Sequence, residues 1–203
     1  IISLFFFYLM IINIKADDTY QDPNSYIFLA FGDSNMEGQG EIEDIDKSNI
    51  SERFYMMSTV NMTFQNRVAG EWYLATPPLC RQWTRLSPLD YFGRTLIQNL
   101  PDKIYVGVIN VAVGGASIAL FDNDTRSDYL NSNNIDKWVK DIAAEYGNDP
   151  FKVLIDSAKK AQKTGVIKGI LLQHGEPDNG DQNWLNTVKT LYERILKELS
   201  LKA

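Results

Sequence analysis

Three short polar turns carry the residues of this sequence that could do chemistry. Residues 32–35 (GDSN), 114–117 (GGAS) and 174–178 (HGEPD) each follow an apolar run. A serine on a tight turn after a strand exposes its hydroxyl to attack a carbonyl carbon, and backbone N–H groups beside it can bind the oxyanion that forms. Taken alone, each turn also has a purely structural explanation. Ser34 can be an N-cap or turn residue, and the glycines at 114–115 can simply end a strand. The polar side chains of 174–178 can be solvated turn residues.

The elements that must position these turns alternate along the chain. Residues 26–31, 104–113 and 166–172 are continuous apolar runs, which is typical of strands in a parallel sheet buried on both faces. Because ligands bind outside the carboxyl ends of such strands, we expect the three turns to form one site. The predicted fold is α/β, with three α/β/α layers around a mostly parallel sheet.

Three helices are predicted between and after the strands. The first has Ser87 as N-cap and runs from Pro88 to about Asn99. The second opens at 149–150 and ends at Gly165, and the third opens at Asp181 with an apolar stripe of 3.6-residue period. Residues 38–88 are poorly periodic, and a stretch of this length is functional or holds short elements.

Composition excludes several classes of protein. The chain has 203 residues with a net charge of −6, which argues against a nucleic-acid partner. It contains one cysteine, Cys80, and one histidine, His174, so neither a Cys-cluster zinc site nor a multi-histidine metal site can form within it. We therefore expect no metal and no cofactor. A lone Cys80 is explained as a buried thiol or as half of a disulfide with a cysteine outside this sequence.

The first residues have the pattern of a secretory signal. Residues 1–12 are apolar at all positions but one, a run too short to span a bilayer. We expect 1–16 to be the remainder of a signal peptide and 17–203 to be one secreted domain without a stable membrane anchor, although a buried first strand is the alternative. Glycosylation sequons begin at Asn49, Asn61 and Asn123 and agree with secretion.

Several spaced blocks together resemble the SGNH/GDSL hydrolases, which have a flavodoxin-like fold. Residues 31–40 (FGDSNMEGQG) are similar to the first block of carbohydrate esterase family six, the acetylxylan esterase and sialate O-acetylesterase-like group. Further blocks follow in the order of that group, at 53–57 (RFYMM), 77–83 (PPLCRQW), 86–95 (LSPLDYFGRT), 106–117 (VGVINVAVGGAS) and 169–181 (GILLQHGEPDNGD).

The resemblance implies roles for individual residues. Ser34 matches the nucleophile, and the backbone N–H groups of Ser34 and Gly115 match oxyanion donors. The third block usually reads HQGE, whereas this chain reads QHGE, so His174 occupies the position of an oxyanion glutamine. Asp33 replaces the glutamine that usually precedes the serine. The remaining site-shaping positions are Asn35, Gly114 and Glu176.

The base that takes the serine proton is the missing part of this pattern. In this family it is a histidine in an Asp/His block near the C-terminus, and no histidine follows His174. We expect the sequence to stop short of that block. His174 acting as the base, and a naturally inactive relative, are the two alternatives.

The resemblance implies a secreted O-acetyl esterase that acts on plant cell-wall polysaccharide of the xylan type. The alternatives are a carbohydrate-binding relative without activity, a sialate O-acetylesterase, or another GDSL esterase. Trp72, Tyr73 and Trp83 flank the long loop and are candidates for stacking on sugar rings, with a place in the core as the other explanation. The sequence does not predict an oligomeric state.

Overall fold

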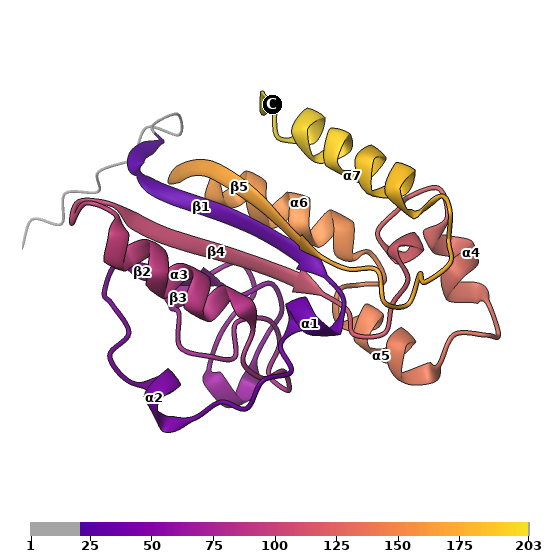
Figure 1. Cartoon of the computed structure of the whole chain (residues 1–203), viewed down its shortest axis with the longest axis horizontal. Helices are drawn as coiled ribbons and strands as arrows, with labels where there is room; N and C mark the ends of the chain where they lie inside the picture. Colours follow the sequence, from indigo (N-terminus) through magenta and orange to yellow (C-terminus); the bar gives the residue numbers. More distant parts are fainter. Residues whose placement is uncertain (1–20, 203) are drawn as a thin grey trace, which may run out of the picture.

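The protein forms one five-stranded sheet between two layers of helices (Figure 1). The computed structural model describes residues 21–202, so the predicted signal segment 1–16 lies outside the described residues. The sheet order is β3-β2-β4-β1-β5, and only the β2–β3 pair is antiparallel. The strands are β1 (Asp22–Gly32), β2 (Phe54–Met57), β3 (Trp72–Leu74), β4 (Tyr105–Ala112) and β5 (Gly165–Gln173).

Each face of the sheet has its own core. On one face pack α5 (Lys137–Glu145), α6 (Pro150–Ala161) and α7 (Trp184–Glu198), and on the other pack α1 (Ser34–Glu37) and α3 (Pro88–Asn99). Strand β1 shows the alternation, because Ile27 and Leu29 enter the first core whereas Ala30 enters the second. Burial on both faces explains the continuous apolar runs of β1 and β4, whereas β5 is a partly buried edge strand. The arrangement confirms the predicted α/β fold.

The remaining elements are short and lie in the connections. They are α2 (Asp44–Lys47), α4 (Arg126–Asn131) and two 3₁₀ turns, Thr63–Gln65 and Ile118–Leu120. Within residues 21–202, no helix is both long and apolar enough to cross a membrane.

All three predicted helices are present in the structure, but one predicted end and one predicted start are wrong. Helix α3 begins as expected, because the Ser87 hydroxyl accepts a hydrogen bond from the Leu89 N–H at 3.3 Å. Helix α6 ends at Ala161, not at Gly165, which instead begins β5. A Cβ on Gly165 would lie 2.7 Å from the Ser25 hydroxyl, so glycine here permits close approach to β1. Helix α7 begins at Trp184, three residues after the predicted Asp181.

The stretch 38–88 contains the two strands that the sequence pattern did not reveal. Strands β2 and β3 have four and three residues, too few for a period of two to be distinguished from chance. They extend the sheet beyond β4, and β3 forms its edge.

Candidate active site

The three polar turns meet at one edge of the sheet, as predicted (Figure 1). Gly32, the last residue of β1, pairs with Ala112 of β4 on one side and with Gln173 of β5 on the other. The Asp33 N–H donates to the Gln173 carbonyl at 3.1 Å, and the Val113 N–H donates to the Gly32 carbonyl at the same distance. Backbone hydrogen bonds therefore fix the turns relative to one another.

Gly32 allows this close joining of the first and third turns. A Cβ at this position would lie 2.0 Å from the Gln173 carbonyl oxygen. No side chain fits there without moving the backbone of β5, so the glycine before Asp33 is a steric requirement of the site.

Ser34 is the first residue of helix α1, and Asp33 is its N-cap. An Asp33 carboxylate oxygen accepts a hydrogen bond from the Asn35 N–H at 3.2 Å, so the simple explanation of Ser34 as the capping residue does not hold. Ser34 is half-buried, and its hydroxyl makes no hydrogen bond with any residue in 21–202. The hydroxyl is therefore available to an incoming group.

Two buried side chains hold helix α1 in place. The amide of Asn110, in the middle of β4, and the hydroxyl of Ser87 both donate to the Met36 carbonyl at 2.9 Å. An asparagine inside an apolar strand is costly unless it is hydrogen-bonded, and here its donor group holds the turn that carries Ser34. The sequence offered a signal for this role, since Asn110 interrupts an otherwise apolar run.

The second turn lies beside Ser34. A Cβ on Gly114 would be 3.5 Å from the Cβ of Ser34. Gly115 has a φ of +69°, and a Cβ there would be 2.3 Å from the indole of Trp138. Within residues 21–202, the backbone N–H groups of Ser34 and Gly115 donate to no acceptor. Two backbone donors without acceptors thus lie on these adjoining turns, and their role as oxyanion donors stays a prediction.

Trp138, from helix α5, is a site residue that the sequence analysis missed. Its indole lies against Gly115, remains half exposed, and donates from Nε1 to an Asp136 carboxylate oxygen at 3.2 Å. No motif surrounds it, because its position depends on the packing of α5 beside the second turn.

The third turn is joined to the first by Glu176. A Glu176 carboxylate oxygen accepts from the Asn35 amide at 2.6 Å and from the Gln173 amide at 2.9 Å. An open depression of about 600 Å³ lies over this turn, lined by Gln173, His174, Gly175, Glu176 and Asn179. The structure therefore brings Asn35 and Glu176 together next to the serine.

The His174 side chain is buried and turned toward the second turn. Its Nδ1 lies 3.3 Å from an Asp178 carboxylate oxygen, and its ring meets Phe121 edge to face. Asp178 in turn accepts from the Ser117 hydroxyl at 2.5 Å and from the Ile118 N–H at 2.9 Å. Burial lowers the pKa of His174, against the attraction of Asp178. His174 thus connects the second and third turns, and its oxyanion role stays a prediction.

A buried ion cluster lies beneath helix α1. The Arg81 guanidinium contacts the Glu37 carboxylate and lies 3.1 Å from a carboxylate oxygen of Glu145. The Arg81 and Glu37 side chains are only 4% and 8% exposed, whereas that of Glu145 is 37% exposed. Burial raises the pKa of Glu37, and the Arg81 charge opposes this effect. The cluster anchors the last residue of the helix that begins with Ser34.

Asp33 and Glu176 form a pair of carboxyl groups beside the serine. Burial, followed by the hydrogen bond with Glu176, raises the pKa of Asp33 to about 6. The hydrogen bonds from Asp33 and Gln173 lower the pKa of Glu176 to about 2. Between these pKa values Asp33 is protonated and Glu176 is ionised.

This pair predicts a pH-dependent contribution to stability. The pKa of Asp33 is raised from 3.8 to about 6 in the folded protein. The contribution of Asp33 to the free energy of unfolding is therefore full below pH 3.8 and is lost as the pH rises through 6. Asp33→Asn keeps a donor for Glu176 at every pH. We expect the melting temperature of the variant, relative to that of the original protein, to rise between pH 5 and pH 8. The rise should be about 2–4 °C for each kcal/mol of unfolding free energy that the original protein loses over this range.

Thermal unfolding of both proteins from pH 5 to pH 8 tests this prediction. Taking the difference between them removes the effect of His174, whose lowered pKa acts in the opposite direction. Glu176 adds little in this range, because its ordinary value of 4.5 and its folded value both lie below pH 5. A difference that stays constant with pH would mean that the two carboxyl groups share no proton.

The three aromatic candidates for sugar stacking lie apart from one another. Trp83 is 68% exposed and forms an edge-to-face pair with Phe64. Tyr73 packs against the core, and its hydroxyl accepts from the Val68 N–H, so it has a structural role. Trp72 lines a pocket at the opposite end of the sheet.

The remaining residues singled out from the sequence are the lone cysteine, the glycosylation sequons and the possible metal ligands. Cys80 is a free and fully buried thiol, and burial raises its pKa to about 11. Asn49, Asn61 and Asn123 are all exposed, and glycosylation at them stays a prediction. Within residues 21–202, no three His, Cys, Asp or Glu side chains gather in a way that could hold a metal ion.

Solved structures of similar fold come from plants and bacteria. A protein from Arabidopsis thaliana shares 18% identity with a TM-score of 0.57, covering 89% of this chain and 71% of its own. A carbohydrate acetylesterase from Xanthomonas citri shares 18% identity with a TM-score of 0.54, covering 87% and 39% respectively. NanS shares 15% identity with a TM-score of 0.56, covering 89% and 64%. These likenesses support the fold, and the chain spans only part of each relative.

A family comparison covers nearly the whole described region. Residues 24–203 match the family described as carbohydrate esterase, sialic acid-specific acetylesterase. The match includes all three turns, with Ser34, the 114–115 glycines and Glu176. This protein is therefore a member of the carbohydrate esterase family of sialic acid-specific acetylesterases.

Proposed function

We propose that this protein is a secreted carbohydrate O-acetyl esterase that removes acetyl groups from neutral plant cell-wall polysaccharide of the xylan type. The observation that carries the proposal is the arrangement at Ser34. The Ser34 hydroxyl has no hydrogen-bond partner in residues 21–202 and lies beside the second turn, and the backbone N–H groups of Ser34 and Gly115 also lack acceptors there. Membership of a carbohydrate esterase family supports the same reaction.

In the proposed reaction the Ser34 oxygen attacks the acetyl carbonyl carbon as its proton passes to a base. The Ser34 and Gly115 N–H groups donate to the oxyanion that forms. Collapse of this intermediate expels the sugar oxygen, which takes a proton, and leaves an acetyl group on Ser34. Water then attacks the acetyl-enzyme, releases acetate and restores the serine.

The base is the part of the mechanism for which no residue around Ser34 is assigned. His174 is the one histidine in the chain, and its ring is buried between Asp178 and Phe121. Within residues 21–202, no hydrogen bond joins His174 to Ser34. The expectation that an Asp/His block supplies the base stays a prediction.

The charge of the site favours a neutral sugar. Of the five residues that line the depression over the third turn, only Glu176 is charged at neutral pH, because the pKa of His174 is lowered. A carboxylate repels the carboxylate of a sialic acid, whereas it can accept hydrogen bonds from the hydroxyl groups of a neutral sugar. This observation supports xylan-type polysaccharide over a sialic acid as the substrate.

Acetate release from two substrates tests this choice. We expect acetate to be released faster from acetylated xylan than from O-acetylated sialic acid at equal concentrations of acetyl groups. Glu176→Gln keeps the size of the side chain but removes its charge. It should therefore reduce the difference between the two rates of acetate release, because the sialic acid carboxylate is no longer repelled. Faster release from the sialic acid by the original protein would assign the protein to the sialate O-acetylesterases instead.

The acyl group should also be small. The Trp138 indole lies against the Gly115 turn and restricts the space beside the oxyanion donors. We expect a 4-nitrophenyl acetyl ester to be cleaved about 10-fold to 200-fold faster than the propionyl ester, and by a still larger factor than the butyryl ester, since each added methylene costs about 1–3 kcal/mol in a pocket without room. The ratio of kcat/KM values measures this preference. A preference for butyryl or longer esters would point to the lipid-acting enzymes.

A further inference from the structure

A second pocket lies at the end of the sheet opposite to Ser34. It has a volume of about 350 Å³, within the range of small-molecule sites, and it is formed by the beginnings of β1, β4 and β5 together with β2 and β3. The parallel strands run from this pocket to the polar turns, so the full length of the sheet separates it from the serine (Figure 1). Its residues take no part in the proposed reaction.

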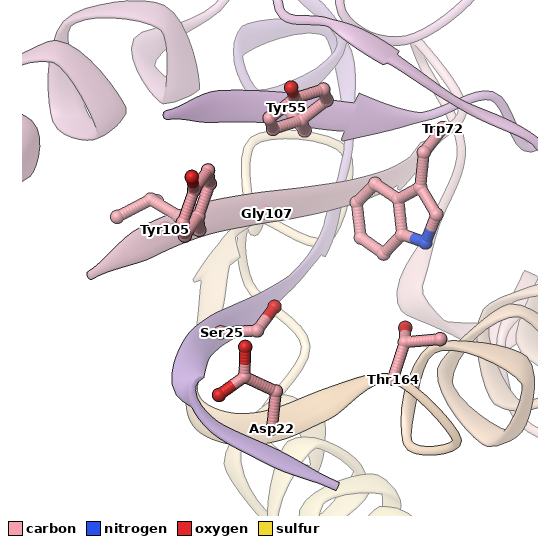
Figure 2. A pocket seen from close by; sticks show the side chains of 8 residues that line it. Asp22, Ser25, Tyr55, Trp72, Tyr105, Gly107 and Thr164 are labelled. Atoms are coloured by element: carbon pink, nitrogen blue, oxygen red, sulfur yellow. The ribbon is translucent and has the colours of Figure 1, made fainter. Parts of the chain in front are cut away.

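Aromatic rings form one side of this pocket (Figure 2). Tyr55 and Tyr105 lie 6.5 Å apart between ring centroids, with the rings tilted by 38°. The Trp72 indole lies across Gly107, where a Cβ would be 2.7 Å from the ring. Glycine at this position in a buried strand leaves room for the indole against the sheet, where it lines the pocket.

Polar groups form the opposite side (Figure 2). One oxygen of Asp22 accepts from the N–H and side-chain amide of Asn24, at 2.9 and 3.2 Å. The other Asp22 oxygen, the Ser25 hydroxyl and the Trp72 indole N–H form no hydrogen bond within residues 21–202. The pocket thus presents both donors and acceptors that are free to bind a ligand.

We propose that this pocket is a second carbohydrate-binding site, which takes a neutral pyranose unit of the polysaccharide. The flat apolar face of a pyranose fits an aromatic ring, and its hydroxyl groups fit the Asp22 carboxylate and the Ser25 hydroxyl on the facing side, with the Trp72 indole N–H as a further donor. The Asp22 carboxylate selects against acidic sugars. Only the choice of a polysaccharide rests on the proposed function, since the pocket itself stands on geometry.

An organic cation is the competing ligand, because three aromatic rings and a carboxylate also attract positive charge. The arrangement favours the sugar. The pocket is open, and the residues that face the rings carry hydroxyl groups as well as the carboxylate (Figure 2). A site at a distance from the serine would keep the protein on a long chain between successive acetyl groups.

Titration with xylotetraose, a neutral oligosaccharide without acetyl groups, tests the site. Calorimetry should show saturable binding, and the Trp72 indole N–H resonance, assigned with Trp72→Phe, should shift during the titration. Tyr105→Ala should weaken binding about fivefold or more, because it removes an exposed ring of the pocket. Since the probe carries no ester, the result does not depend on whether Ser34 is a nucleophile.

Tyr192→Ala is the matched control, because Tyr192 is 41% exposed, compared with 43% for Tyr105, and lies outside the pocket on α7. It should bind xylotetraose as the original protein does. Trigalacturonate should bind more weakly than xylotetraose, because the Asp22 carboxylate repels its carboxylates. Asp22→Asn should reduce this difference in affinity. The proposal is overturned if xylotetraose does not bind, if both tyrosine variants bind equally, or if choline displaces the sugar and binds more tightly.

Discussion

Ser34→Ala should lower kcat/KM for an acetyl ester by about 10⁴-fold or more while the protein keeps its fold. Removing the hydroxyl removes the atom that becomes acetylated, and loss of a serine nucleophile typically costs this much or more in enzymes of this chemistry. The side chain makes no hydrogen bond within residues 21–202, so its loss leaves no described partner unsatisfied. Initial rates with 4-nitrophenyl acetate measure the effect.

The control for this experiment is Ser127→Ala, at an exposed serine on α4. It should retain the original rate, and the circular dichroism spectra of both variants should match that of the original protein. An active Ser34→Ala variant would remove this serine from the mechanism. A protein that includes the Asp/His block and is inactive before any substitution, yet binds acetylated xylan, would instead be the carbohydrate-binding relative.

Arg81→Met should destabilise the protein by about 3–5 kcal/mol, the usual cost of leaving a buried charge without its partner. The Glu37 carboxylate is 8% exposed and would lose its contact with the guanidinium. Glu145 would lose its partner at little cost, because its side chain is partly solvated. The free energy of unfolding from urea denaturation at pH 7 measures the change.

Two further variants separate the buried charge from the loss of packing. Replacing both partners, as in Glu37→Leu with Arg81→Met, should recover most of the lost stability, since no uncompensated charge is left. Arg126→Met breaks a partly exposed pair with Asp149 and should cost about 1 kcal/mol or less. If Arg81→Met is no more destabilising than Arg126→Met, then the buried cluster does not stabilise helix α1.

The sequence predicted the core of this fold because both faces of its central strands are buried. The apolar runs at 26–31 and 104–113 stand out for that reason, and they lie within or nearly within β1 and β4. The run at 166–172 lies within β5, an edge strand whose side chains are only partly buried. The capping pattern at Ser87 and Pro88 marked a helix start correctly. Strands β2 and β3 gave no such signal, since they are short and gain their stability from pairing with β4 and each other.

Some features of the candidate site could also be predicted from the sequence, whereas others depend on tertiary packing. The turns that carry Ser34, Gly115 and Glu176 could be predicted to converge, because the carboxyl ends of parallel strands share one sheet edge. The position of Trp138 against Gly115 could not, because it depends on how α5 packs. The Asp33 and Glu176 pair was also missed, since a proton shared between residues so distant in sequence requires both turns to be in place.

The most direct test of the account is covalent labelling with a fluorophosphonate, followed by mass spectrometry of the digested protein. Such reagents phosphorylate a serine only where its nucleophilicity is raised and the oxyanion is stabilised. We expect one adduct, on the peptide that contains Ser34, and none in Ser34→Ala. An adduct on another serine, such as Ser117, or an unlabelled protein that still hydrolyses acetyl esters, would contradict the assignment of Ser34 as the nucleophile.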